Sequence, residues 1–594
     1  MKKIVDLLND ELKSAFTQCG YDEKYAKVVV SNRPDLCQYQ CNGCMAAAKE
    51  YKKAPAVIAG EVVAKLAGST AFSKVEAVNP GFINMNLSAE FIAEYVKEMG
   101  RHEKFGCDET KKNKTIMLDY GGANVAKPLH VGHLRSAIIG ESIKRICRYC
   151  GYDTVGDVHL GDWGLQMGLI IMELKNRKPE LPYFDDSYTG EYPAEPPFTL
   201  SELEDIYPCA SRKSKEDEEF AKAAHEATVM LQNGHRGYNA IWKHIMSISL
   251  ADLKRNYDNL NVSFDVWKGE SDAKPYIEDM IKDFVDRGYA YESQGALVVD
   301  VALDSDKKEI PPCIVRKSDG AAIYATTDLA TMIERQKLYH PFKYIYMTDK
   351  RQEMHFTQIF RVAKKTGIVP EDTEMDFLGF GTMNGKDGKP FKTRNGDMLR
   401  LEYLIKDVED AVYSKIKENR DMEDEEARKI AKVVGLAAIK YGDLSNQAVK
   451  DYIFDIDRFS SFEGDTGPYV LYTIVRIKSI MKKYEQTYAE DIKALADRMG
   501  DFLAPEGASE TDLCLLLAKF SEVIESAYAE LAPHKICKFI YDVANVFNSF
   551  YHDTKILTEE NEAKRRSYIA LISLTKSILE TCIDLLAIKA PDRM

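Results

Sequence analysis

Two histidines lie three residues apart where a strand pattern gives way to a helix pattern. The apolar run at 115–118 predicts a strand, and the residues from about 131 to 150 have helical periodicity, with His130 and His133 at their start. A strand entering a helix through a Gly- and Pro-containing turn collects unpaired N–H groups and the positive end of the helix dipole, where phosphate binds well. Imidazoles there can donate hydrogen bonds to phosphoryl oxygens as charge builds up. The segment therefore predicts a nucleotide-activating site.

The elements around the histidines predict a parallel α/β core. The helix has an apolar stripe made of Leu134, Ala137, Ile138, Ile143 and Ile146, and Gly151 provides its C-terminal stop. Thr154–His159 is expected to be the next strand, which completes a βαβ unit of the parallel type. Further core strands are expected around Leu297–Val301, Cys313–Lys317, Tyr344–Thr348 and Phe377–Met383.

The chain has 594 residues, too many for one core, so several domains are expected. We expect an α/β protein with a Rossmann-like parallel-sheet core, an N-terminal α+β domain and a C-terminal all-α helical bundle. The boundaries that we predict are 1–106 for the leading domain, 107–405 for the core and 406–594 for the bundle. A proline-rich entrance followed by charged helical stretches predicts an insertion into the core at about 180–290.

The composition limits which partners, thiol state and cellular location are expected for the protein. A net charge of −14 argues against bulk electrostatic binding of nucleic acid, but it does not exclude local basic surfaces. The twelve scattered cysteines indicate reduced thiols. Cys37, Cys41 and Cys44 have the spacing of an iron–sulfur site, but Gly43 replaces the aromatic residue usual before the last cysteine, so buried thiols are preferred. No apolar run approaches the roughly 18 residues that span a bilayer, and the start lacks a secretory signal, so a cytoplasmic location is expected.

Three motifs in a fixed order carry a family resemblance. They are Ala126-Lys-Pro-Leu-His-Val-Gly-His-Leu-Arg-Ser136, His159-Leu-Gly-Asp-Trp-Gly-Leu-Gln-Met-Gly168 and Gly385-Lys-Asp-Gly-Lys-Pro-Phe-Lys-Thr-Arg394. In these three motifs, taken together, the chain resembles the arginyl-tRNA synthetases, which are class I aminoacyl-tRNA synthetases. Further segments resemble the same family, so that the likeness spans essentially the whole chain: Gln38–Gly43, Asp451–Asp455, Phe462–Gly464 and Ala590–Met594.

The resemblance implies a two-step reaction. Arginine attacks the α-phosphate of ATP to give arginyl-adenylate and pyrophosphate, and the arginyl group then moves to the 2′-OH of the terminal adenosine of tRNA(Arg). His130, Gly132 and His133 would bind ATP, and the two imidazoles would be catalytic. A purely structural histidine pair is the alternative interpretation.

The second signature of the family departs from its usual form. The family carries a loop of the Lys-Met-Ser-Lys-Ser type, whereas residues 390–394 lack both signature lysines at their usual places. Lys389, Lys392 and Arg394 still supply cations for ATP. Family members without the second lysine carry one just before the first histidine, where this chain has Lys127. We therefore expect Lys127 and Lys392 to share the catalytic phosphate charge; solvent-exposed lysines without a role are the alternative.

A guanidinium is planar, always charged and prefers bidentate carboxylates, so an arginine pocket needs ionised acids. Asp119 ends the first core strand, where open α/β sheets bind ligands, although it aligns with a glutamate in some relatives. A solvated aspartate at a helix start is the alternative for Asp328. The positions that match the family's arginine-binding residues are Asp119, Asn124, Tyr324, Asp328 and Gln352.

Contacts with tRNA are expected from both ends of the chain. The leading domain resembles the family domain that grips the outer corner of tRNA, near the D-loop, and the final bundle resembles the anticodon-binding domain. Exposed amide and phenol groups can stack on or bond a splayed base, which makes Tyr39, Gln40 and Asn42 candidates; ordinary turn chemistry at Asn42-Gly43 is the alternative. The expected partners are tRNA(Arg), L-arginine and ATP, in a monomer. Mg²⁺ should accompany ATP, held mainly by phosphates, with no tightly bound protein metal.

Two rival functions follow from the same residues. A nucleotidyltransferase that makes a small cofactor would share the phosphate-binding core, but it would not need the leading domain or the long helical tail. An inactive paralogue that acts as a tRNA-binding or scaffold protein is favoured only by the altered signature loop. The intact His130, Gly132, His133 and Asp119 weigh against that second rival.

Overall fold

The chain folds into two compact units, each built from separate stretches of sequence. The computed structural model describes residues 1–107, 113–127, 129–318, 320, 322–389, 400–419, 421–490 and 494–594. The first unit comprises Met1–Thr110, Phe462–Asp584 and Lys589–Met594, and the second comprises Lys111–Ser461 and Leu585–Ile588. The second unit therefore continues past residue 405 to Ser461.

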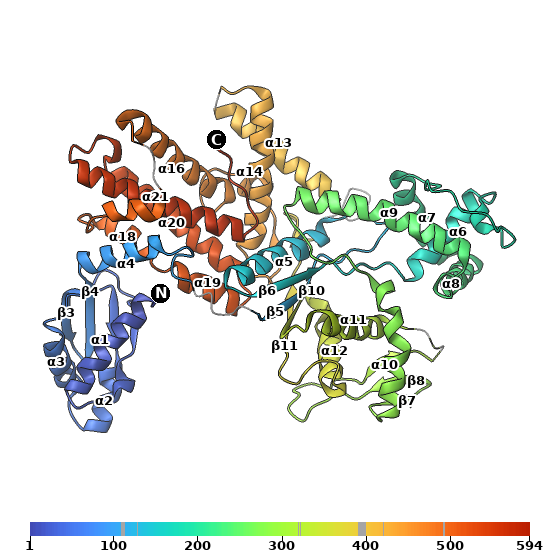
Figure 1. Ribbon diagram of the computed structural model, residues 1–594, viewed down its shortest axis with the longest axis horizontal. Coiled ribbons are helices and arrows are strands. Elements are labelled where there is room, and N and C mark those ends of the chain that lie inside the picture. Colours follow the sequence, from blue (N-terminus) through green and yellow to red (C-terminus); the bar gives the residue numbers. More distant parts are fainter. Residues whose placement is uncertain are drawn as a thin grey trace. The chain divides into compact units, whose positions relative to one another are not determined.

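A four-stranded parallel sheet forms the centre of the second unit, in the order β11-β10-β5-β6. Its strands are β5 (Thr115–Asp119), β6 (Asp153–Asp157), β10 (Lys343–Asp349) and β11 (Glu374–Phe380). Helix α5 (Val131–Tyr149) packs on one side of the sheet, while α11 (Tyr324–Tyr339) and α12 (Glu353–Thr366) lie on the other (Figure 1). Strand β5, helix α5 and strand β6 make the expected βαβ unit, and the α/β fold class is confirmed.

Two strands predicted for this core belong to another sheet. β8 (Ala296–Val299) and β9 (Cys313–Arg316) pair antiparallel with β7 (Ala290–Ser293), so their placement in the parallel sheet was wrong. Gln294 and Gly295 connect β7 and β8, and both have positive φ, 52° and 81°. A two-residue turn of this kind joins antiparallel strands, whereas parallel neighbours need a long crossover.

Helices fill the rest of the second unit. Gly168 allows α6 (Leu165–Arg177) and α8 (Glu218–Gln232) to approach closely, because a Cβ there would lie 2.0 Å from the Ala224 carbonyl oxygen. The short strands β12 (Met383–Asn384) and β13 (Tyr452–Ile453) pair in parallel beyond the main sheet. The helices are α6 (Leu165–Arg177), α7 (Leu200–Glu216), α8 (Glu218–Gln232), α9 (Arg236–Asn259), α10 (Lys274–Asp286), α13 (Leu401–Asn419), α14 (Asp424–Leu444) and α15 (Ile456–Phe459).

The first unit joins a small α+β domain to a set of helices, as the predicted fold class requires. Its antiparallel sheet has the order β1-β2-β4-β3, with strands at Val28–Val30, Tyr39–Cys41, Phe82–Leu87 and Phe72–Val78. The helices are α1 (Ile4–Gln18), α2 (Gly43–Tyr51), α3 (Pro55–Leu66), α4 (Ala89–Arg101), α16 (Gly467–Tyr488), α17 (Leu495–Arg498), α18 (Ala508–Leu517), α19 (Phe520–Ala529), α20 (Pro533–Asp553) and α21 (Glu562–Leu585). Within the described ranges, no helix combines the length and the apolar character that crossing a bilayer demands.

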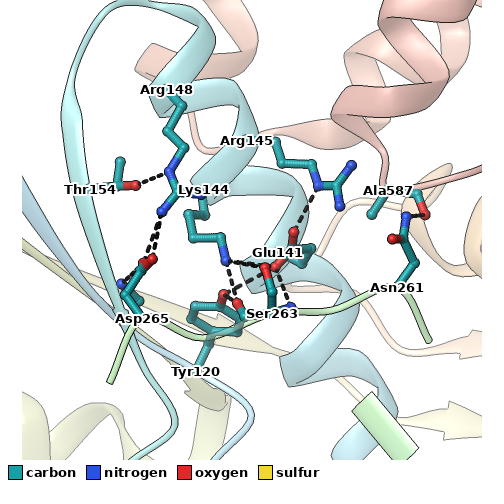
Figure 2. Close-up of polar contacts among 11 residues, drawn as sticks. Tyr120, Glu141, Lys144, Arg145, Arg148, Thr154, Asn261, Ser263, Asp265 and Ala587 are labelled. Carbon is teal, nitrogen blue, oxygen red and sulfur yellow. Dashed lines mark hydrogen bonds and ion pairs between the residues drawn. The ribbon is translucent and has the colours of Figure 1, made fainter. Parts of the chain in front are cut away.

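Buried charges fix helix α5 in the second unit (Figure 2). The side chains of Glu141 and Lys144 are 1% and 0% exposed, and Lys144 Nζ lies 2.9 Å from Glu141 Oε2. The backbone N–H of Ser263 donates to the same carboxylate at 3.0 Å, and the Tyr120 hydroxyl donates to the Ser263 carbonyl oxygen at 2.7 Å. Burial lowers the pKa of Lys144, with Glu141 opposing. The cluster therefore joins α5 to the end of β5 and to the chain that follows α9.

Replacing Lys144 should destabilise the second unit strongly. Lys144→Met leaves the buried Glu141 with Arg145 as its remaining charged partner at 2.7 Å, so the cost should lie below the about 3–5 kcal/mol of a fully broken buried pair. Urea unfolding should show a lower midpoint, and hydrogen exchange should rise in α5. The matched control is Lys429→Met, because Lys429 pairs with Glu425 on the exposed face of α14 and such pairs contribute roughly 0–1 kcal/mol. Equal effects of the two substitutions would contradict the assignment.

Candidate active site

A cleft of about 630 Å³ opens at the carboxyl ends of the parallel strands. Asp119 reaches it from the end of β5, His159 from beyond β6, and residues 346–349 from β10. The start of α5 and residues 380–383 also line it, as do Gly122, Asp328, Arg351 and Phe356. This is the crevice where open α/β sheets bind their ligands.

The two signature histidines hold each other in one tautomer at the head of α5. His130 Nδ1 accepts a hydrogen bond from the Gly132 N–H at 3.0 Å, and His133 Nδ1 accepts one from the His130 N–H at 3.1 Å. The ring centroids are 3.8 Å apart. A neutral imidazole whose Nδ1 accepts carries its proton on Nε2. Each ring therefore has an Nε2–H donor left for a ligand, and both residues line the cleft.

Burial keeps both imidazoles uncharged. It lowers the pKa of His133 to about 3, and the nearby His130 and Lys127 add to this effect. Burial, followed by the charge of Lys127, also lowers the pKa of His130. Because both values fall below the ordinary histidine value, the folded protein keeps these rings neutral as the pH falls through about 6.5, where the unfolded chain takes up protons. The pair thus offers neutral donors throughout the physiological range.

Arg135 links the histidine helix to the far wall of the cleft. Its Nε donates to Asp443 Oδ2 at 2.9 Å, and its Nη1 donates to the carbonyl oxygens of Gly381 at 2.7 Å and Lys450 at 3.2 Å. The side chains of Arg135 and Asp443 are 2% and 0% exposed. Gly381 stands between β11 and β12, so a single guanidinium fixes the distance between α5 and the segment leading to residues 385–394. The sequence marked Arg135 only as part of a motif.

Asp119 already carries a guanidinium from the protein itself. Arg335, from α11, lies 2.6 Å from Asp119 Oδ2 and 2.6 Å from Asp157 Oδ2, and it also donates to the Tyr346 hydroxyl at 3.0 Å. Its side chain is 3% exposed. One oxygen of Asp119 is therefore occupied, and this acid is charge-compensated inside the cleft wall.

Among the described residues, Asp328, which lines the cleft, and Glu270, which lies near it, have no lysine or arginine partner. Asp328 lines the cleft, 2.7 Å from His355 Nε2. Burial raises the pKa of Glu270 to about 7, His159 opposes that rise, and Asp328 adds to it. The sequence analysis missed Glu270, because it begins a short 3-10 turn at Glu270–Ala273 and meets Asp328 only through the fold. In the sequence, the only signal for Glu270 was a single acidic residue directly after Gly269.

The other predicted ligand residues are spread around the cleft. Gly132 lines it. Tyr324 is 72% exposed and lies one helical turn before Asp328 on α11, while Gln352 is exposed at the end of the turn Lys350–Gln352. Asn124 forms a bridge with Gly161, and its Oδ1 would lie 2.2 Å from a Cβ at that glycine.

Of the predicted cations that the structure describes, neither Lys127 nor Lys389 is in the lining of the cleft. Lys127 Nζ lies 4.5 Å from the centre of the Tyr207 ring, in a hollow beside α7. Lys389 is exposed, and its backbone N–H donates to Asp387 at 3.0 Å. Lys392 and Arg394 lie outside the described residues.

The predicted tRNA contacts lie in the first unit. Tyr39 is buried, 4% exposed, so its ring does not offer a face on which a base could stack. Gln40 is partly exposed and donates to Asn84 at 2.8 Å. Asn42 is exposed just before α2.

Three family profiles match consecutive parts of the chain. Residues 2–87 match the Arginyl tRNA synthetase N terminal domain, residues 96–456 match the tRNA synthetases class I (R), catalytic domain, and residues 470–594 match the DALR anticodon binding domain. Among curated relatives, Arginine--tRNA ligase of Agathobacter rectalis is 61% identical over 601 residues, and that of Alkaliphilus oremlandii is 55% identical over 594 residues; each alignment covers 100% of both chains.

Solved structures agree with these matches. The arginyl-tRNA synthetase of Plasmodium falciparum superposes with a TM-score of 0.80 at 25% identity, and that of Thermus thermophilus with 0.77 at 21% identity, each over 100% of both chains. A parallel-sheet crevice with paired imidazoles at the head of its first helix is thus the catalytic core of a class I aminoacyl-tRNA synthetase. The chain belongs to the arginyl-tRNA synthetase family. The suspected resemblance is confirmed.

Nitrogen NMR can test the state of the histidine pair. With ¹⁵N-labelled histidine, His130 and His133 should show the Nε2–H tautomer unchanged from pH 8 to pH 6, because burial lowers both pKa values. The single substitutions His130→Gln and His133→Gln assign the two signals. The exposed His340 serves as the internal control. Titration of both signature rings in parallel with ordinary histidines would rule out the neutral pair.

Proposed function

We propose that the protein attaches arginine to tRNA(Arg) in two steps, at the expense of ATP. The carboxylate of arginine attacks the α-phosphate of ATP, which forms arginyl-adenylate and releases pyrophosphate. The 2′-OH of the terminal adenosine then attacks the arginyl carbonyl carbon, and AMP leaves. The carrying observation is the intact imidazole pair in a chain 61% identical, over its full length, to Arginine--tRNA ligase. The inactive scaffold alternative has no support from the comparisons.

The imidazole pair serves the first step. Nε2–H groups of His130 and His133 donate to the phosphate oxygens, and they stabilise the charge that develops as the P–O bond to pyrophosphate breaks. Because both rings are already fixed by backbone donors, they need no reorganisation when that charge appears. Gly132 leaves room for the triphosphate beside them. Mg²⁺ enters as part of the ATP substrate, held mainly by the phosphates.

The pyrophosphate needs cations, and the two arginines of the described cleft lining, Arg135 and Arg351, are already paired with Asp443 and Asp349. We assign this role to Lys127 together with Lys389, Lys392 and Arg394 of the signature loop. The charge of Lys127 already reaches the imidazoles, where it helps to lower the pKa of both. Its ammonium group rests over Tyr207, and a cation–π contact at a partly exposed site is worth only about 0.5–1 kcal/mol. The attraction of a bound triphosphate for the ammonium group can exceed that contact energy and draw Lys127 away from Tyr207.

Recognition of arginine follows from which acids of the site already have a cationic partner in the protein. Asp119 and Asp157 share the buried Arg335, whereas Asp328 and Glu270 are left to attract an external cation. A guanidinium bound between two carboxylates gains paired, charge-assisted hydrogen bonds. Tyr324 adds a phenol beside Asp328. We place the amino-acid end of the substrate near Asn124, Gln352 and the second oxygen of Asp119.

The remaining parts serve the tRNA. We assign residues 1–106, with Tyr39, Gln40 and Asn42, to the outer corner of the tRNA, and the helical residues 406–594 to the anticodon. Since Tyr39 is buried, its contribution there would be to support Gln40 on the same strand. We propose a monomeric enzyme, as the family resemblance implies, and a cytoplasmic one, since the twelve cysteines are reduced.

Exchange of labelled pyrophosphate into ATP tests the function directly. The reaction should require arginine and should fail with lysine or citrulline, because neither presents a charged planar fork. Running it with and without tRNA shows whether tRNA must bind before activation. Exchange without any amino acid would favour a nucleotidyltransferase. No exchange under any condition, together with tight tRNA binding, would favour the scaffold.

Asp328 and Glu270, the acids without a lysine or arginine partner, should control arginine affinity. Asp328→Asn should raise the KM for arginine by about two orders of magnitude, the cost of breaking a desolvated charge pair, and leave the KM for ATP unchanged. The pKa of Glu270, raised to about 7, makes this carboxyl gain a proton and lose its charge as the pH falls through 7. kcat/KM for arginine should therefore fall by up to about tenfold per pH unit below that point.

Glu270→Gln provides the matched control for this pH dependence. It should flatten the profile near pH 7 and hold kcat/KM at the low-pH level. A profile that keeps its shape in Glu270→Gln would remove Glu270 from the pocket, and an unchanged KM in Asp328→Asn would remove Asp328.

A further inference from the structure

His159 is a buried polar group that the reaction described above does not use. Its side chain lines the cleft together with Asp119 and Asp328. Neither Nδ1 nor Nε2 is exposed to solvent, and neither has a hydrogen-bond partner among the described residues. A buried polar group left unpaired costs about 1–3 kcal/mol. Such a cost in the wall of a ligand cleft points to a partner that arrives with the ligand.

The backbone of His159 is strained, and its neighbours hold the strain in place. Its φ of 30° lies in the left-handed region, which costs an L-residue about 1–2 kcal/mol. On one side, the Val158 N–H donates to the Val266 carbonyl oxygen; on the other, the Leu160 N–H donates to the Lys268 carbonyl oxygen at 2.7 Å. The strand predicted to reach His159 therefore ends at Asp157. Strain that is imposed from both sides is typical of functional positions.

The surroundings of the ring favour a cationic ligand. Asp119 and Asp328 share the cleft wall with it, and Glu270 lies close enough for His159 to oppose the rise in its pKa. Asp119 is compensated by Arg335, and no lysine or arginine of the described part of the chain bonds the ring. The ligand chemistry that satisfies both the acids and an imidazole acceptor is a positively charged N–H donor.

We propose that His159 contacts the bound amino acid and accepts a hydrogen bond from one of its cationic N–H groups. The donor is either the α-ammonium or the guanidinium of arginine, both of which are charged N–H donors of the same substrate. His159 thereby adds to affinity and specificity for arginine without taking part in phosphate chemistry. This role rests on the arginine activation proposed above.

The test compares three purified full-length variants with wild type in arginine-dependent pyrophosphate exchange. His159→Phe keeps a ring of similar size and removes both nitrogens. His159→Asn keeps a polar amide and tolerates the left-handed backbone. The matched control is His340→Phe, because His340 is also left-handed, with a φ of 45°, and is absent from the cleft lining. KM for arginine, KM for ATP, kcat and the urea midpoint are measured for each.

His159→Phe should raise the KM for arginine by about 10- to 100-fold, the loss of a hydrogen bond to a charged group, with an unchanged KM for ATP. Its urea midpoint should stay level or rise, because two unpaired buried nitrogens are gone. His159→Asn should recover part of the affinity, and His340→Phe should match wild type. Inhibition by 5-guanidinopentanoic acid, which lacks the α-ammonium, separates the donors. Equal inhibition of wild type and His159→Phe identifies the α-ammonium, whereas weaker inhibition of the variant identifies the guanidinium.

An unchanged KM for arginine in His159→Phe, or an equal rise in both KM values, would overturn the proposal. If His159→Phe does not fold, the same comparison is made with His159→Asn: a rise in the KM for arginine without a rise in the KM for ATP supports the proposal, and any other result overturns it. Absence of arginine-dependent exchange in the wild type would instead overturn the proposed function itself, so the two failures are distinguishable.

Discussion

The geometry of the active site depends on two buried ion pairs that fix helix α5. Arg135 pairs with Asp443 near the histidine end of the helix, and Lys144 pairs with Glu141 two turns further on. A buried pair resists disruption mainly because the loss of one partner leaves the other charge desolvated and alone. The pairs therefore act less as a source of stability than as a constraint on position. They leave His130, at the head of the helix, little freedom to move relative to the sheet.

The same logic of compensated and uncompensated charge shapes the arginine side of the cleft. Arg335 is a guanidinium held by two aspartates, Asp119 and Asp157, with its remaining contact to a tyrosine hydroxyl. Arginine presents the same chemical group, so the protein must keep its own Arg335 from competing for Asp328 and Glu270, the acids that we propose bind the ligand. It does so by burial, because Arg335 is 3% exposed and cannot exchange partners with solvent. Because the planar, permanently charged guanidinium distinguishes arginine from other amino acids at the binding step, a separate editing domain is unnecessary.

Local patterns predicted the histidine helix and the parallel βαβ unit. The signals for them, apolar periodicity and a glycine at the helix end, depend only on residues close together in the sequence. Sheet membership is not local, and β8 was therefore assigned to the wrong sheet although the strand itself was foreseen. Glu270 escaped prediction for the same reason, since Asp328 stands far along the chain. Lys127 shows a third limit: sequence order placed it beside the histidines, but the direction of its side chain depends on Tyr207 of the inserted helices.

Some of the buried polar atoms without a hydrogen-bond partner belong to the cleft and its supports. Among the described residues, these include Arg135 Nη2, Arg335 Nε and both ring nitrogens of His159. Each costs about 1–3 kcal/mol, and a fold selected for stability alone would have replaced them with apolar side chains. All three residues line the cleft or fix one of its acids. The protein thus accepts local instability where polar groups must stand ready for a charged substrate, and it offsets that cost with the well-packed helices and strands around them.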